Sequence, residues 1–90
     1  MTHYLAKDIS IDGNLITLNV KGKGLLTVDF SKWKKLMDQI GGTSKIKEVK
    51  LLGDLLEFPN DIHVEIEDFV TMAEQQKLPN ISEKIAGHYL

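Results

Sequence analysis

The densest concentration of chemically active side chains is a group of six lysines around the single tryptophan, Trp33. Ammonium groups attract phosphates and carboxylates, so one surface that carried these lysines could bind nucleic acid or an acidic protein. In the simpler interpretation, which we favour, the lysines solubilise an outer face and Trp33 joins the core. The candidate partner-binding residues are Lys32, Lys34, Lys35, Lys45, Lys47 and Lys50.

The charge pattern favours a protein partner over DNA. All eleven basic residues are lysines, whereas recognition of specific bases depends strongly on the arginine guanidinium group. Residues 21–50 hold eight lysines and three acids, and residues 51–90 hold eight acids and two lysines. The sequence therefore predicts an unidentified protein partner or self-association through complementary charge, with nucleic acid possible but disfavoured.

The three imidazoles, His3, His63 and His88, give only a weak metal-binding pattern. Only His63 has a carboxylate at helical spacing, since Glu67 follows four residues later. If a helix begins near Glu65, then His63 lies at its mouth as a capping or solvent-facing residue. We therefore expect no metal site.

The acids near this helix could be paired carboxylates for acid–base or metal chemistry, but that chemistry requires two of them at a fixed separation in a cleft. We expect a solvated acidic face, on which Asp61 and Glu65 lie nearest the helix N-terminus. The acids are Asp61, Glu65, Glu67, Asp68 and Glu74.

Nucleophilic catalysis has no clear candidate in this sequence. There is no cysteine, and no histidine partner can be identified for Ser10, Ser31, Ser44 or Ser82. The segment Lys21-Gly22-Lys23-Gly24 resembles a phosphate loop only superficially, because it joins two predicted strands. We expect a hairpin turn there, no cofactor and no enzymatic activity.

The elements that must position these residues follow from hydrophobic periodicity. Alternating apolar residues predict strands at 8–11, 15–20 and 26–30, joined by an Asp12-Gly13 turn and a glycine turn into an antiparallel meander. Residues 45–52 and 55–58 predict a further hairpin around Gly53-Asp54.

Two stretches carry helical periodicity. Ser31 stands at an N-cap position, and a helix is expected over 32–40, before Gly41-Gly42. A second helix should begin at Glu65. The expected core stripes are Trp33, Leu36, Met37 and Ile40 in the first helix, and Ile66, Phe69, Val70 and Ala73 in the second.

Together these patterns predict an α+β fold, in which a small antiparallel sheet of about five strands, a meander plus a hairpin, packs against two helices. Residues 1–80 should form one domain, and 81–90 a C-terminal tail that could form one helical turn. At 90 residues, 42% hydrophobic and 27% charged, the chain can bury one core. The N-terminus lacks the pattern of a secretory signal and no segment suits a membrane span, so we expect a cytoplasmic location.

Two short segments carry a family resemblance. The step Val28-Asp29-Phe30-Ser31, followed later by the segment 55–62, resembles the bacterial family catalogued as domain of unknown function 2442, over about residues 5–73. Phe58 stands where tryptophan is common in that family, and Asp61 where glycine is common. The resemblance implies a compact α+β domain of unassigned function, sometimes joined to a helix-turn-helix domain or encoded beside another small protein. It implies no catalytic residues.

These observations favour a non-catalytic protein-interaction or regulatory module. A weak nucleic-acid binder that uses the lysines is the alternative, and a small enzyme is the least favoured class. Homodimer formation is one form that the interaction could take.

Overall fold

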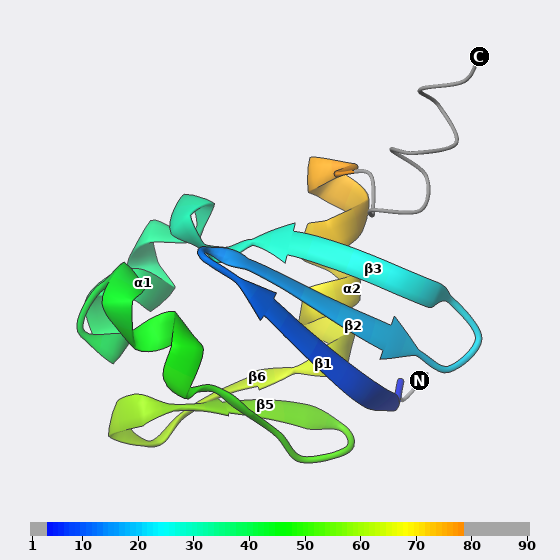
Figure 1. Ribbon diagram of the computed structural model, residues 1–90, viewed down its shortest axis with the longest axis horizontal. Coiled ribbons are helices and arrows are strands. Elements are labelled where there is room, and N and C mark those ends of the chain that lie inside the picture. Colours follow the sequence, from blue (N-terminus) through cyan, green and yellow to red (C-terminus); the bar gives the residue numbers. More distant parts are fainter. Residues whose placement is uncertain (1–3, 79–90) are drawn as a thin grey trace.

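The computed structural model describes residues 4–78, which form an α+β fold of two three-stranded antiparallel sheets and two α-helices (Figure 1). The first sheet contains β1 (Ala6–Asp12), β2 (Leu15–Val20) and β3 (Gly24–Asp29). The second contains β4 (Lys50–Leu51), β5 (Leu55–Phe58) and β6 (Ile62–Glu65). The helices are α1 (Lys34–Ile40) and α2 (Ile66–Gln76), and the 3₁₀ turns are η1 (Phe30–Lys32), η2 (Thr43–Glu48) and η3 (Pro59–Asp61).

The α+β class is confirmed, but the strands do not form the single sheet of about five strands that we predicted. The expected strand over 45–52 is mostly wrong, because residues 43–48 form η2 and only Lys50 and Leu51 pair with β5. Its buried residues, Ile46 and Val49, lie three apart, which matches the three-residue turn of a 3₁₀ helix. η2 packs against η1 and α1, and the chain then enters the second sheet at β4.

The meander of the first sheet is confirmed. β1 pairs with β2 around Gly13, whose φ of 61° suits a tight hairpin, and β2 pairs with β3 around the predicted glycine turn. Ile16, Leu18 and Val20 alternate along β2 and are almost fully buried. Residues 21–24 are therefore the hairpin turn that we expected.

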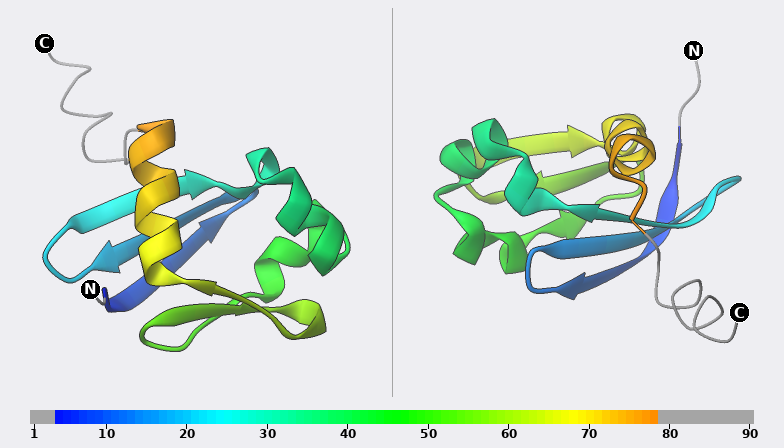
Figure 2. Two further views of the ribbon diagram at one scale, coloured as in Figure 1. Left: turned by 180° about the vertical axis from the view of Figure 1, so that it is seen from behind. Right: turned by 90° about the horizontal axis from the view of Figure 1, so that it is seen from above.

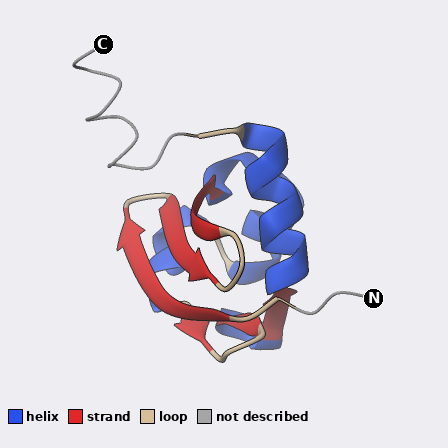
Figure 3. Cartoon of the chain, turned by 90° about the vertical axis from the view of Figure 1, so that its right-hand side faces the viewer, coloured by secondary structure: helices blue, strands red, loops and turns tan. Residues whose placement is uncertain are grey.

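α2 lies across one face of the first sheet, and α1 lies at the far end of the molecule (Figure 2). From the side, α2 lies beside the strands of the first sheet (Figure 3). The predicted stripe of α2 is confirmed, because Ile66, Phe69, Val70 and Ala73 are all buried. The buried residues of α1 are Leu36, Met37 and Ile40, with Trp33 partly buried against the same core.

The entry into α1 differs from the predicted cap. The Asp29 carboxylate accepts hydrogen bonds from the Ser31 backbone N–H (3.0 Å) and from the Ser31 hydroxyl (2.6 Å), so Asp29 caps η1. The helix itself begins at Lys34, with Trp33 as its N-cap residue. Ser31 is thus not the N-cap of α1, because it lies within η1, three residues before that helix begins.

A side-chain amide covers part of the outer edge of β3. The Phe30 N–H bonds to Asn14 (2.9 Å), so the backbone groups of the preceding residue, Asp29, point away from β2. Gln76 at the end of α2 bonds to both of them. Its Oε1 accepts from the Asp29 N–H (2.7 Å), and its Nε2 donates to the Asp29 carbonyl (3.1 Å).

The two sheets are joined at the loop between β4 and β5. The Ala6 N–H donates to the Gly53 carbonyl (3.0 Å), and the Ile66 N–H donates to the Asp54 carbonyl (3.1 Å). The same loop therefore contacts the start of β1 and the start of α2.

We expect Phe69→Ala to lower the free energy of unfolding by about 3–5 kcal/mol and Leu36→Ala by about 2–5 kcal/mol, because each leaves a cavity in the core. Both side chains are buried, with 0% and 4% exposed. Urea denaturation measures the loss, and Leu52→Ala, at a side chain 50% exposed, is the control. Native-like unfolding of either core variant would contradict the core assignment.

We expect Gln76→Ala to lower the free energy of unfolding by about 1–2 kcal/mol, since two backbone groups lose their partner. Gln76→Glu should lose a similar amount, because a carboxylate can accept from Asp29 but cannot donate to it. Gln75→Ala, at the exposed neighbour on the same helix, is the control in thermal and urea unfolding. Equal losses of unfolding free energy in Gln75→Ala and Gln76→Ala would rule out a stabilising role for the hydrogen bonds between Gln76 and Asp29.

Candidate functional site

The six candidate lysines are all exposed and lie on η1, α1, η2 and β4. The first three of these elements pack against one another at one end of the molecule (Figure 1). Lys34 and Lys35 project from α1 on the side away from its buried residues. Trp33, between them and Lys32, stacks on Phe30 with ring centroids 5.7 Å apart, so it packs against the core.

The remaining three lysines have different surroundings. Lys45 forms an ion pair with Glu48 (3.4 Å), and its side chain passes beside Gly41, at the carbonyl end of α1. A cation is favoured there by the helix dipole. Lys47 lines a shallow hollow with the turn between β1 and β2.

Lys50 belongs to the second sheet, where the strand register places it opposite Glu57. The structure therefore groups five of the six lysines on η1, α1 and η2, and it places the sixth beside a carboxylate. We call these five residues the basic region: Lys32, Lys34, Lys35, Lys45 and Lys47.

The acids that we assigned to one helical face divide among three elements, η3, β6 and α2. Glu67 and Asp68 are exposed in the first turn of α2, where the helix dipole favours negative charge. Glu65 is the N-cap residue of α2 and the last residue of β6. Asp61 lies before β6, so its expected place at the helix N-terminus is wrong.

Glu74, near the end of α2, pairs with the turn between β2 and β3. Lys23 Nζ lies 3.3 Å from the Glu74 carboxylate. This hydrogen bond, with further contributions from Tyr4, raises the pKa of Lys23 above its ordinary value. The contact therefore persists until the pH rises through that raised pKa.

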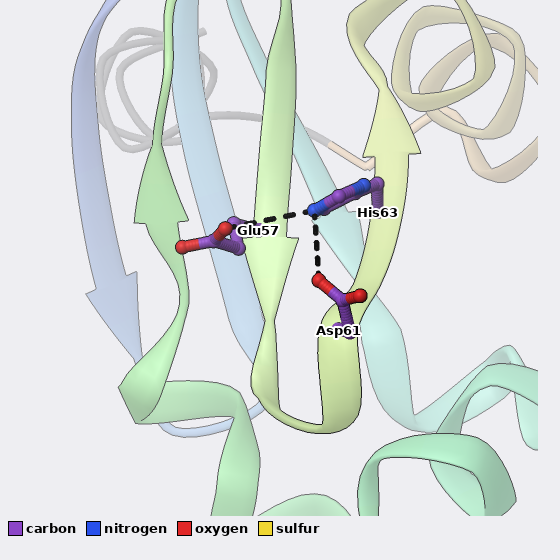
Figure 4. Close-up of side chains that lie close together, drawn as sticks. All are labelled: Glu57, Asp61 and His63. Atoms are coloured by element: carbon purple, nitrogen blue, oxygen red, sulfur yellow. Dashed lines mark ion pairs between the residues drawn. The ribbon is translucent and has the colours of Figure 1, made fainter.

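His63 lies on β6 and not at the mouth of a helix, so the predicted capping role is wrong, whereas the alternative of a solvent-facing residue is correct. Its Nε2 faces two carboxylates, at 3.5 Å from Glu57 Oε2 and 3.7 Å from Asp61 Oδ1 (Figure 4). Alternation along β6 explains this position, because Ile62 and Val64 turn inward and His63 turns outward. We call Glu57, Asp61 and His63 the histidine–carboxylate cluster.

Two backbone features position the cluster. Glu57 and His63 are directly opposite each other in the antiparallel pair of β5 and β6. Asp61 comes from the connecting turn, where Asn60 and Asp61 both have left-handed backbones, with φ of 66° and 61°. The Asn60 side chain donates to the Gln39 carbonyl (3.1 Å), which ties this turn to α1.

The cluster is open to solvent. The exposed side-chain fractions are 44% for His63, 38% for Glu57 and 92% for Asp61. One ligand atom from each residue lies within 4.8 Å of the other two. Such a group can hold a shared proton or a cation.

The cluster combines residues that sequence spacing did not bring together. We considered Glu67 as the partner of His63 because it is four residues away, and that spacing matters only in a helix. The useful signal was the alternation from Ile62 to Glu65, which marks a short strand and turns His63 to the outer face of the sheet.

The other candidates contribute less to a site. Ser31 is bonded to Asp29, whereas Ser10 and Ser44 are exposed. His3, His88, Ser82 and the predicted C-terminal tail lie outside the described residues. In residues 4–78, no helix combines the length and the apolar character that a membrane crossing requires.

Comparison of the chain with protein-family models, with curated proteins and with solved structures found no match. The function must therefore be argued from the residues themselves.

We expect Asp61→Gly to be more stable than Asp61→Ala by about 1 kcal/mol, because glycine adopts the left-handed backbone at this position without a steric penalty. Both variants lose the same carboxylate, so the comparison isolates the backbone. Thermal unfolding of the pair measures the difference. An alanine variant at least as stable as the glycine variant would contradict the left-handed conformation.

Proposed function

We propose that this protein is a non-catalytic, cytoplasmic interaction module that binds an acidic protein surface through the basic region. The observation that carries the proposal is the placement of five exposed lysines on three packed elements, which include only two acids, Asp38 and Glu48. Such an excess of one charge steers association with a partner of opposite charge.

A second copy of this chain could supply the acidic surface. α2 exposes Glu67 and Asp68 on an element separate from the basic region (Figure 2). Opposite charges on two different parts of one molecule allow head-to-tail contact between copies, or contact across a two-fold axis. Self-association is thus one form of the proposed interaction.

The lysines would also attract nucleic acid, which is the alternative function. We favour protein because lysine lacks the bidentate geometry that guanidinium offers to phosphates and bases. A regulatory role and membership of the family of domain of unknown function 2442 accord with this proposal and remain predictions.

Reversing two charges in the basic region should abolish partner binding. We expect Lys34→Glu combined with Lys35→Glu to lose a partner that the parent protein captures from nuclease-treated lysate at low salt. The matched control is Lys7→Glu combined with Lys21→Glu, which makes the same charge change at exposed lysines outside the basic region. Equal capture of the partner by both variants would refute binding through the basic region. Loss of the parent's signal on nuclease treatment would favour nucleic acid.

A charge swap tests whether the partner is a second copy. If so, Lys34→Glu with Lys35→Glu should prevent self-association in sedimentation experiments, as should Glu67→Lys with Asp68→Lys. A mixture of the two variants should associate again, because the first variant retains the acidic surface of α2 and the second retains the basic region. A mixture that stays monomeric, where the parent associates, would exclude pairing between these two surfaces.

A further inference from the structure

The histidine–carboxylate cluster lies on the outer face of the second sheet, outside the basic region. We propose that Glu57, Asp61 and His63 bind a divalent transition-metal ion of the Zn²⁺ class. The proposal concerns a site separate from the partner-binding function, so either one can fail without the other.

The spacing of the ligand atoms fits such an ion. A tetrahedral Zn²⁺ with bonds of about 2.0–2.1 Å to nitrogen and oxygen places neighbouring ligand atoms about 3.3 Å apart. His63 Nε2 lies 3.5 Å from Glu57 Oε2 and 3.7 Å from Asp61 Oδ1, and all three atoms lie within 4.8 Å of one another. Small rotations of exposed side chains bring the three atoms onto one ion.

The backbone holds the three ligands near this geometry. Glu57 and His63 are fixed by their pairing across β5 and β6, which sets their separation without any contribution from the ion. Asp61 is one residue beyond Asn60, whose side chain anchors the turn to the Gln39 carbonyl (3.1 Å). Ligands placed by regular structure lose less freedom on binding than ligands on a loose loop.

The donor set selects the class of ion. An imidazole nitrogen with two carboxylates suits zinc and its neighbours, whereas Ca²⁺ and Mg²⁺ prefer all-oxygen sites. Two carboxylates also balance the charge of a divalent ion. Three protein ligands on an open surface leave the fourth position to water.

Lys50 is the nearest cationic competitor in the sheet. The register runs from Lys50 to Glu57 and then to His63, so these three residues form one row across β4, β5 and β6. Lys50 therefore places a positive charge on the side of Glu57 opposite His63, and this charge lowers the affinity for a cation.

Zinc titration of the metal-free protein tests the site. At a pH above the usual histidine pKa of about 6.5, calorimetry should detect one Zn²⁺ site in the parent chain. We expect His63→Gln, Glu57→Gln and Asp61→Gly each to weaken Zn²⁺ binding by at least about tenfold, since loss of a direct ligand should cost no less than loss of a group that only hydrogen-bonds to a ligand. Asp61→Gly removes a ligand while suiting the backbone of the turn, so its loss of binding cannot be attributed to misfolding.

The matched control is Glu67→Gln, which removes the same charge from the acid at helical spacing from His63 and should bind Zn²⁺ as the parent does. In NMR spectra, Zn²⁺ should shift the ring signals of His63, and Ca²⁺ at the same concentration should not. The proposal would be overturned if the parent did not bind Zn²⁺, or if the three ligand variants bound it as tightly as the parent. A loss of binding in Glu67→Gln as large as in the ligand variants would also overturn it.

Discussion

The burial of Phe30 is the interaction on which the rest of the structure depends. Its ring lies 5.7 Å from Trp33, 5.5 Å from Phe58 and 5.9 Å from Phe69, measured between centroids. These partners belong to the entry of α1, to β5 and to α2, so one side chain fixes the second sheet and both helices relative to the meander. The preceding residue, Asp29, is held on its backbone by Gln76 and on its carboxylate by Ser31.

This packing also determines which side chains face the solvent. Phe58 points into the core, so its neighbour Glu57 must point outward along the strand. Val64 is buried in the paired strand, and His63 is therefore turned to the same outer face as Glu57. The placement of Glu57 beside His63 is thus a consequence of two inward residues and one strand register, and the turn adds Asp61.

The sequence predicts the elements that local periodicity controls. The meander and the stripe of α2 are correct because each buries a regular face against a single partner. The prediction of a single sheet is wrong because it assigned Ile46 and Val49 to a strand. These apolar residues fit a strand as readily as a 3₁₀ turn. The cluster could not be predicted, because the pairing of Glu57 with His63 depends on β6, a strand of four residues that spacing alone does not place beside β5.

The two proposed sites lie close enough in the fold for one to influence the other electrostatically. Lys50 links them, since it follows η2 by two residues and faces Glu57 across the second sheet. A divalent ion held by Glu57 and Asp61 would neutralise two carboxylates, one of which lies opposite Lys50 in the second sheet. The positive field that attracts an acidic partner would then be stronger. Linkage requires the converse as well, so an acidic partner bound at the basic region would raise the affinity of the cluster for the ion.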